Sequence, residues 1–290
     1  MSDIPGERLQ KILANAGLGS RRQAEQWIRE QRVKLNGRVA QLGDRAQFED
    51  IILFDGRPIS RKHFTGEQRF VLLYNKPIGE LVTRSDPQGR PTVFDRLPKL
   101  PNGRWISVGR LDINSSGLLL FTNDGALAQR LMHPQYQMAR EYAVRVRGTV
   151  TPEKLQQLVQ GITLEDGPAR FEEIVESGGE GFNRWYHVVI MEGRKREVRR
   201  LWQAVDTEVS RLKRVRYGPI ILDSAVPAGH WRELDKQERK ALLLAVDKAP
   251  DRPWGRLRQT NTRESNLYKR SIAKQRIAQR QSKFKSWDEV

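Results

Sequence analysis

The chain has 290 residues, which is enough for one large or two modest domains that each bury a core. It contains no cysteine, so disulfides, thiolate metal sites and cysteine nucleophiles are excluded. Lysine and arginine number 52 against 35 aspartates and glutamates, and the formal net charge of +17 predicts a polyanionic partner, most simply nucleic acid.

Membrane and metal functions are not expected. The four histidines are far apart and lack metal-ligand spacing, so no metal site is predicted. No apolar run approaches the length of a membrane span, and the first residues lack the basic start and apolar core of a signal peptide. We therefore expect a cytoplasmic protein that does not contact a membrane.

Residues 8 to 60 are expected to form two short helices followed by a small sheet. Apolar residues keep helical spacing on one face of each helix. Ser20 and Gln23 have the spacing of a capping box at the start of the second helix. Asn36 followed by Gly37, between alternating residues, predicts a hairpin.

Residues 69 to 246 mix strands and helices without strict alternation, which predicts an α+β domain on a mixed, largely antiparallel sheet. The strand candidates are 70–74, 105–108, 117–122, 141–146, 171–175, 185–191 and 209–217. The expected helices start after Asp124, at Thr151, after Gly193 and near Asp235. Residues 251 to 290 are polar and carry eleven basic and four acidic residues. We expect a disordered tail, either until it meets RNA or as a solvated segment without function.

One carboxylate, Asp112, lies between two apolar runs and next to Arg110. Ionised carboxylates are rarely buried without a partner or a chemical task, so Asp112 is the first candidate for chemistry. Asp124 precedes a helix with an apolar face and is predicted to be its cap. Asp112 thus has no second acidic candidate beside it, whereas common glycosidases need two carboxylates.

Two basic runs follow in the second half of the chain. Residues 192 to 205 end a strand and open a helix. Helical spacing places Arg199 on the flank of the apolar face, where it can reach inward, while Arg196 and Arg200 point toward solvent or phosphate. In the second run, residues 210 to 217, the alternating positions Arg211, Lys213 and Arg216 are expected to face a surface. Each run by itself is as compatible with a solvated face as with RNA; several runs in one basic domain favour a phosphate track.

These motifs resemble those of the RsuA-type ribosomal RNA pseudouridine synthases. The resemblance rests on Gly109-Arg-Leu-Asp-Ile-Asn-Ser-Ser-Gly-Leu-Leu-Leu-Phe-Thr-Asn-Asp-Gly125, Arg140-Glu-Tyr-Ala-Val144 and Glu192-Gly-Arg-Lys-Arg-Glu-Val-Arg-Arg200. One departure is Ser115, where the family usually has threonine. Within the family, segments 75–79, 90–98 and 178–181 and the tryptophan after the third motif look closest to the 23S rRNA type B.

The resemblance implies the domain organisation. Residues 1–62 resemble an S4 RNA-binding domain and 69–248 the catalytic domain; 63–68 would be a linker and 249–290 a basic tail. Arg21 and Arg22 open a helix of the S4-like part, where free backbone amides and positive charge suit phosphate. The alternative for both arginines is a solvated helix start.

The resemblance also implies the chemistry, which is isomerisation of uridine to pseudouridine without a cofactor. Asp112 matches the catalytic aspartate and acts on the sugar, either as nucleophile or as base. Tyr142 matches the residue that stacks on the target base, and its alternative is a core aromatic. Arg110 matches the arginine that replaces the flipped base, and Arg199 the one that pairs with the aspartate.

Three hypotheses follow. The first is a monomeric enzyme that modifies 23S rRNA, or 16S rRNA as the alternative within the family. The second is a non-catalytic RNA-binding protein of ribosome assembly, which the presence of Asp112, Tyr142 and Arg199 disfavours. The third is another enzyme of nucleic-acid glycosidic bonds, which the absence of a second acid disfavours.

Overall fold

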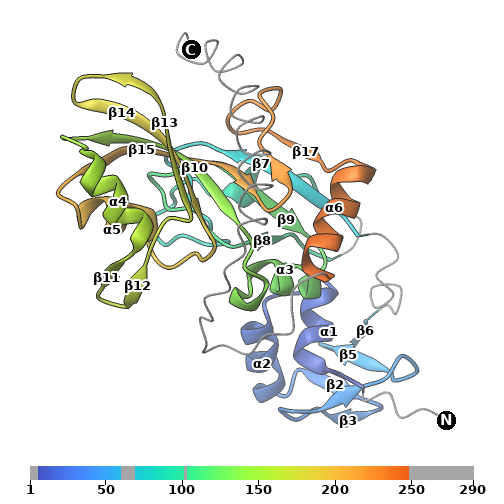
Figure 1. The fold of residues 1–290 in the computed structure, drawn as a ribbon. Coiled ribbons are helices and arrows are strands. Elements are labelled where there is room, and N and C mark those ends of the chain that lie inside the picture. Colours follow the sequence, from blue (N-terminus) through green and yellow to red (C-terminus); the bar gives the residue numbers. More distant parts are fainter. Residues whose placement is uncertain (1–5, 60–68, 101–102, 248–290) are drawn as a thin grey trace.

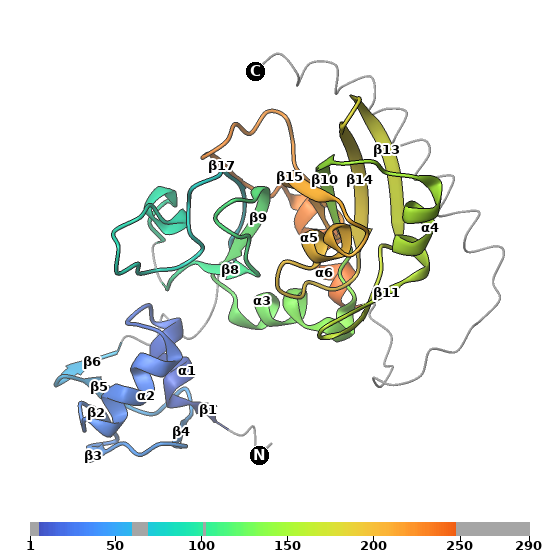
Figure 2. The same cartoon turned by 90° about the vertical axis from the view of Figure 1, so that its left-hand side faces the viewer.

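The computed structural model describes residues 6–59, 69–100 and 103–247, which form a small N-terminal lobe and a larger lobe (Figure 1). The expected linker 63–68 lies outside the described residues, as does the basic tail 249–290. In two views at right angles, the N-terminal lobe lies on the α3 side of the larger lobe (Figures 1 and 2).

The N-terminal lobe has the predicted pair of helices and small sheet. Its elements are β1 (Glu7–Arg8), α1 (Leu9–Asn15), α2 (Arg21–Arg29), β2 (Val33–Leu35), β3 (Arg38–Val39), β4 (Arg45–Ala46), β5 (Ile52–Phe54) and β6 (Arg57–Pro58). The capping box is confirmed, because Ser20 accepts from the amide of Gln23 and the Gln23 side chain accepts from the amide of Ser20. The hairpin is also confirmed, with positive φ at both Asn36 and Gly37.

The larger lobe is built on a mixed nine-stranded sheet. Its strands are β7 (Val71–Lys76), β8 (Ile106–Val108), β9 (Ser116–Thr122), β10 (Arg140–Arg147), β13 (Glu173–Glu180), β14 (Asn183–Ile190), β15 (Glu208–Tyr217), β16 (Ile220–Ile221) and β17 (Trp231–Glu233). The main order is β13-β14-β10-β15-β9-β7-β17, with β8 on β9 and β16 on β15. All its described pairs are antiparallel except β15 with β9, so the predicted fold class is confirmed.

Helices cover both faces of this sheet. They are α3 (Gly125–Met132), α4 (Pro152–Gln160), α5 (Glu197–Gln203) and α6 (Lys236–Asp247), and a hairpin of β11 (Ile162–Leu164) and β12 (Gly167–Ala169) lies beside them. One apolar cluster joins the sheet to α4 and α5, and a second joins it to α3 and α6. Asp124 caps α3 as predicted, accepting from the amides of Ala126 and Leu127.

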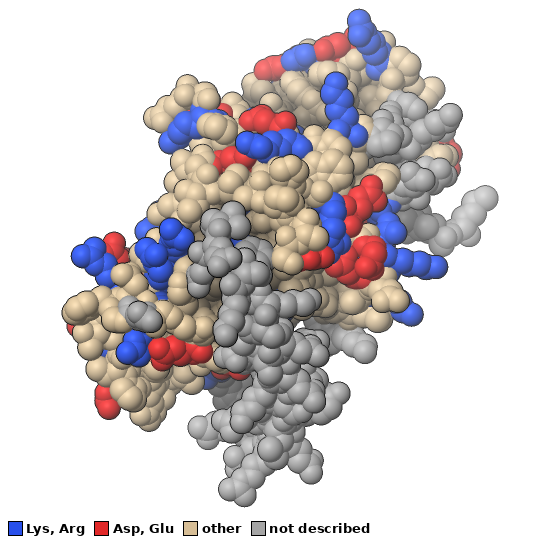
Figure 3. All heavy atoms as spheres, turned by 90° about the horizontal axis from the view of Figure 1, so that it is seen from above, with Lys and Arg blue, Asp and Glu red and all other residues tan. Residues whose placement is uncertain are grey.

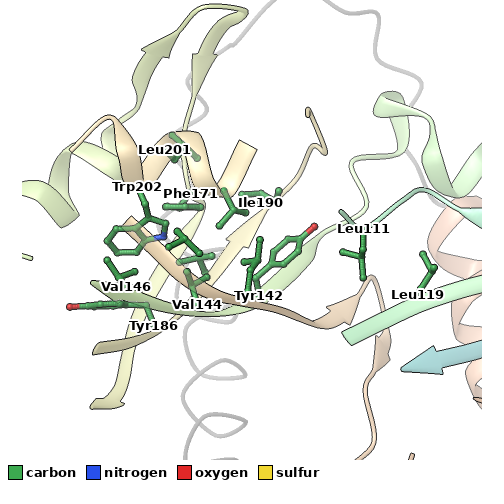
Figure 4. Packing of buried hydrophobic residues seen from close by; sticks show 14 of the residues in the cluster. Leu111, Leu119, Tyr142, Val144, Val146, Phe171, Tyr186, Ile190, Leu201 and Trp202 are labelled. Carbon is green, nitrogen blue, oxygen red and sulfur yellow. The ribbon is translucent and has the colours of Figure 1, made fainter. Parts of the chain in front are cut away.

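Trp202 anchors α5 to the sheet. Its side chain is fully buried, with its ring centre 5.1 Å from that of Tyr186 and 5.9 Å from that of Phe171 (Figure 4). Burying an aromatic of this size stabilises the fold by about 3 kcal/mol. This packing fixes where α5, and the basic loop that precedes it, meet the strands.

Gly117 is the point of closest approach between β9 and β15. Its φ is +99°, and an added Cβ would lie 2.8 Å from the amide nitrogen of Arg214 and closer still to the carbonyl oxygen of that residue. Only glycine lets the two strands pair here, in parallel, with Gly117 opposite Arg214. Strands that are far apart in the sequence are thereby held side by side.

We expect Gly117→Ala to lower the free energy of unfolding by at least about 3 kcal/mol, because strain at positive φ adds to a clash with backbone. Gly89→Ala is the matched control, since Gly89 also has positive φ but has nothing within 4 Å of an added Cβ. It should cost only about 1 kcal/mol in urea unfolding. Equal losses in the two variants would contradict the close approach at Gly117.

Candidate active site

The loop of residues 112–115 precedes β9 and is held by its own backbone. All four of its carbonyl oxygens accept hydrogen bonds. The donors, in order along the loop, are the Ser115 amide at 3.0 Å, the Gly79 amide at 2.8 Å, Arg199 Nη2 at 3.0 Å and Lys76 Nζ at 2.9 Å. A loop with every carbonyl satisfied by a donor has little freedom to move, so Asp112 is presented in a fixed position.

Lys76 at the end of β7 is fully buried behind this loop. Its ammonium donates to the carbonyls of Pro77 and Ser115, each at 2.9 Å. Burial lowers the pKa of Lys76 to about 8, although the negative charges of Glu80 and Asp112 oppose this shift. Lys76 was not among the predicted site residues, because the predicted strand ended at residue 74, whereas β7 continues through Asn75 to Lys76.

A cavity of about 400 Å³ opens beside the loop. Its lining comes from residues 109–115, from residues 190–198 up to the start of α5, from the adjoining ends of β10 and β15, and from Met132. The lining residues are Gly109, Arg110, Leu111, Asp112, Ser115, Met132, Arg140, Tyr142, Ile190, Gly193, Arg194, Lys195, Arg196, Glu197, Val198, Leu212, Arg214 and Tyr217. Of the predicted site residues, Arg110, Asp112, Tyr142 and Arg196 therefore share one cavity.

Asp112 is less buried than its apolar flanks suggested. Its side chain is 37% exposed at the cavity, with Arg196 Nη1 3.9 Å from its Oδ2. The expectation of a buried carboxylate is thus corrected, because the apolar runs on either side pack into the sheet while the loop between them faces outward. Asp112 can be reached by a substrate.

Arg196 is exposed and lies beside Asp112, a position that helical spacing did not predict. Helical spacing was applied from Gly193 onward, but α5 begins only at Glu197. Arg196 is the residue before the helix and has the left-handed φ of +52°, which turns its side chain toward Asp112. A non-helical residue cannot be placed by helical spacing.

Arg199 reaches inward as predicted, but it contacts the loop backbone. Its guanidinium donates to the carbonyl of Val209 at 2.7 Å and to that of Asn114 at 3.0 Å. The ion pair with Asp112 that the family resemblance implied is made by Arg196 instead. Arg199 still interacts electrostatically with Asp112, and burial lowers the pKa of the Arg199 guanidinium.

Arg200 is held by Asp166 at the tip of the β11–β12 hairpin. Both of its terminal nitrogens donate to that carboxylate at 2.8 Å. On the face seen in Figure 3, lysines and arginines lie beside acidic groups in the same way. Ion pairs of this kind occupy basic side chains, so the number of basic residues overstates how many are available to RNA.

The apolar wall of the cavity is formed by buried side chains. Tyr142 on β10 is 7% exposed, and Leu111 and Val198 are 7% and 4% exposed. Figure 4 shows Tyr142 at the end of the packed cluster, with Leu111 beyond it. Tyr142 thus belongs to the core and lines the cavity at once. Arg110, in contrast, is exposed at the cavity.

Glu197 is a second carboxyl group in the cavity lining, which the sequence analysis did not foresee. It is 2% exposed, and burial raises its pKa. Both of its oxygens accept from Arg194, one from the backbone amide at 3.0 Å and one from the side chain at 3.4 Å. Its hydrogen bonds therefore close the basic loop 192–197 that carries Arg196.

Arg21 and Arg22 lie in the N-terminal lobe, away from this cavity. Both are exposed in the first turn of α2, and Arg21 lines a surface hollow of about 480 Å³ together with Arg8, Lys11 and Arg45. Burial lowers the pKa of Arg104 in the larger lobe, and the positive charge of Arg21 lowers it further.

Comparison with known proteins identifies the family. Residues 70–204 match the family described as RNA pseudouridylate synthase, and residues 7–52 match the S4 domain. A protein of Pseudomonas aeruginosa named "Ribosomal large subunit pseudouridine synthase B" is 61% identical over 258 residues, covering 86% of this chain and 67% of that protein. The chain belongs to the RNA pseudouridine synthase family.

Other proteins that match this chain are also pseudouridine synthases. Proteins of the same name from Vibrio cholerae and Escherichia coli K12 are 57% and 56% identical, covering 85% and 84% of this chain and 77% and 85% of theirs. A solved structure described as "Crystal structure of pseudouridylate synthase" matches with a TM-score of 0.57 and 28% identity over 82% of this chain and all of that one. The pseudouridine synthase is thus an RNA-modifying isomerase with an N-terminal S4 domain.

Lys76 should give the enzyme a distinctive dependence of stability on pH. Its folded pKa of about 8 lies below the ordinary value of 10.5, so the unfolded state holds more protons between these values. Stability from this group is therefore gained as pH rises, by roughly 1.5 kcal/mol between pH 8 and pH 9.5. The change should be measured as the difference in unfolding free energy between wild type and Lys76→Met. A difference that is constant with pH would show that the lysine does not titrate in this window.

Proposed function

We propose that this pseudouridine synthase isomerises one uridine of 23S ribosomal RNA, with Asp112 as the catalytic residue. Relatives at 56–61% identity are named for the large ribosomal subunit, which supports this choice of RNA. The observation that carries the proposal is the single cavity in which the fixed loop presents Asp112 beside Tyr142 and Arg196.

Asp112 would act on the ribose of the target nucleotide. The N1–C1′ bond breaks, the base turns, and C5 bonds to C1′, so no atom is gained or lost. A carboxylate serves this chemistry either by adding to C1′ or by taking the proton from the 2′ carbon. Arg196 lies 3.9 Å from this carboxylate, and Arg199 interacts with it electrostatically.

The target uridine has to leave its stack to reach Asp112, at a cost of about a few kcal/mol. Tyr142 offers an aromatic surface inside the cavity on which the flipped base can stack. Arg110, exposed at the cavity, is suited to fill the place that the base has left. Leu111 and Val198 limit the access of water to the sugar.

The S4 domain would anchor the RNA. Arg21 and Arg22 stand at the N-terminal end of α2, where positive charge and free amides favour phosphate. The proposed boundaries are 1–62 for this domain, 69–248 for the catalytic domain and 249–290 for the tail; the matched ranges 7–52 and 70–204 lie within the first two of these. Arg196 and Arg200 would add phosphate contacts. Arg200 can do so only after its ion pair with Asp166 is replaced by one with a phosphate of the RNA.

The proposal includes a monomer in the cytoplasm. No helix in residues 6–59, 69–100 or 103–247 is long and apolar enough to cross a membrane.

Asp112→Asn should abolish conversion while leaving binding and folding intact, because the amide keeps the shape but cannot act as nucleophile or base. The rate would fall by at least about 10³-fold. It is measured as tritium release from 23S rRNA transcripts that carry 5-tritiated uridine, with 16S transcripts in parallel. Release from 16S rRNA alone would support the small-subunit alternative. Conversion by the variant at the wild-type rate would refute the role of Asp112, and no conversion by wild type would favour a non-catalytic RNA-binding protein.

Replacing Arg21 and Arg22 together by glutamine should weaken rRNA binding and make it less sensitive to salt. Each phosphate contact contributes about 0.7–0.9 to the slope of log K against log salt, so the slope should fall by about 1.5. Filter binding over a range of salt measures this. Arg29→Gln, at the other end of α2, is the control and should change the slope by less than half as much. An unchanged slope in the double variant would exclude the helix start as an RNA contact.

A further inference from the structure

Arg214 on β15 is a buried cation whose hydrogen-bonding capacity is largely unused. The residue is 2% exposed and lines the cavity that holds Asp112. Its Nε donates to the carbonyl of Leu118 at 2.8 Å, but neither of its terminal amino groups has a hydrogen-bond partner in the described part of the chain, and Nη2 is enclosed. No carboxylate among the described residues pairs with it.

The strand register places the Arg214 side chain beside Tyr142, which lines the same cavity. Arg214 stands directly opposite Tyr142 across β10 and β15, and cross-strand partners share a face of the sheet. An irregularity in the ladder next to this pair leaves Arg216 opposite Glu141, and these two form an ion pair at 2.7 Å. Arg216 is thus satisfied within the protein, whereas Arg214 is not.

A buried guanidinium without a counter-charge is costly, since it has lost water and gained little in return. The ring of Tyr217, 5.2 Å from Cζ, recovers part of this cost. The ring is shared with Arg140, whose Cζ lies 5.1 Å from its centre, so two cations stand at this end of the cavity. Such an arrangement is retained where a ligand supplies the missing acceptor or negative charge.

The position of Arg214 favours the base over a phosphate as this ligand. Phosphates of a flipped nucleotide stay with the RNA backbone at the mouth, where the exposed Arg110 and Arg196 lie. The Arg214 side chain is 2% exposed and lies opposite Tyr142, so it contacts the base that stacks on Tyr142 instead. In uracil, the groups that accept hydrogen bonds there are the two carbonyl oxygens.

We propose that Arg214 is a further catalytic residue, which donates hydrogen bonds to a carbonyl oxygen of the flipped uracil and stabilises the negative charge of the departing base. This inference rests on the proposed function. When the N1–C1′ bond breaks, its electron pair stays with the uracil ring, and the charge spreads onto the carbonyl oxygens. C5 then gives a pair to C1′, the hydrogen on C5 leaves as a proton, and N1 gains one, so the sequence is balanced.

When the contacted oxygen is the one at C4, the same contact selects uracil over cytosine. A guanidinium only donates hydrogen bonds. Uracil presents an oxygen at C4, whereas cytosine presents an amino group that would face the donors of Arg214 without an acceptor. A buried donor left unpaired in this way rejects the wrong base strongly.

The test compares Arg214→Gln with wild type, in the full chain, on 23S rRNA transcripts made with uridine or with 5-fluorouridine. Fluorine withdraws electrons and stabilises the uracil anion, so the fluorinated base depends less on the guanidinium. On uridine RNA the single-turnover rate should fall by about 100-fold or more. On fluorinated RNA the loss should be smaller by at least about tenfold, with RNA affinity unchanged within about twofold. Fluorine cannot leave C5 as a proton does, so the fluorinated product is the nucleoside that keeps fluorine on C5 after C5 has bonded to C1′ and water has added to C6 and N1. Both products are counted by chromatography after complete digestion, including RNA still bound to protein.

Arg184→Gln, which removes an exposed arginine from neighbouring β14, is the control and should convert both RNAs at the wild-type rate. Thermal unfolding checks that each variant is folded; if Arg214→Gln is not, Arg214→Lys enters the same comparison. Equal losses of rate on the two RNAs, or a loss of RNA affinity without a loss of rate, would overturn the role of Arg214. The proposed function would still stand as long as the wild-type enzyme converts uridine. Failure of wild type on both RNAs would overturn both proposals.

Discussion

The contact between Gly117 and the backbone of Arg214 is the constraint on which the rest of the site depends. Because Gly117 has no side chain, β9 can run parallel to β15 in a sheet whose other described pairs are antiparallel. The loop that carries Asp112 leads directly into β9, and Tyr142 lies across β15 on β10. One backbone contact thus brings the candidate catalytic carboxylate, the aromatic platform and the buried guanidinium to the same cavity.

Some of the charged residues around that cavity hold the backbone in place, whereas Asp112 is left to react. Lys76 and Arg199 donate to carbonyls of the Asp112 loop, so they fix its shape and raise the positive potential behind it. Glu197 fixes the shape of the basic loop before α5 by accepting a hydrogen bond from the amide of Arg194. Asp112 itself remains 37% exposed, and its one ion pair within the described residues is with Arg196 at 3.9 Å, which leaves the carboxylate free to meet a substrate. Preorganised charges of this kind need not rearrange during the reaction.

Sequence patterns predicted the elements well and the contacts of charged residues poorly. Ser20, Asp124 and the Asn36-Gly37 turn were predictable because their hydrogen bonds are local. The position of Arg196 beside Asp112 was not predicted, because its left-handed backbone breaks the helical periodicity on which the prediction relied. Lys76 was missed because its hydrogen bond to Ser115 joins segments that are far apart in the sequence. Glu197 was missed although its partner Arg194 is only three residues away, because the sequence pattern does not show that Glu197 is buried.

The central claim is that this chain installs one pseudouridine in 23S rRNA and that Asp112 does so. The most direct measurement is a map of pseudouridines in the rRNA of cells that lack the protein, with the wild-type gene or the Asp112→Asn gene returned. The account predicts that one 23S position loses its pseudouridine, regains it with wild type, and does not regain it with the variant. An unchanged map in cells without the protein, or restoration by the variant, would contradict it.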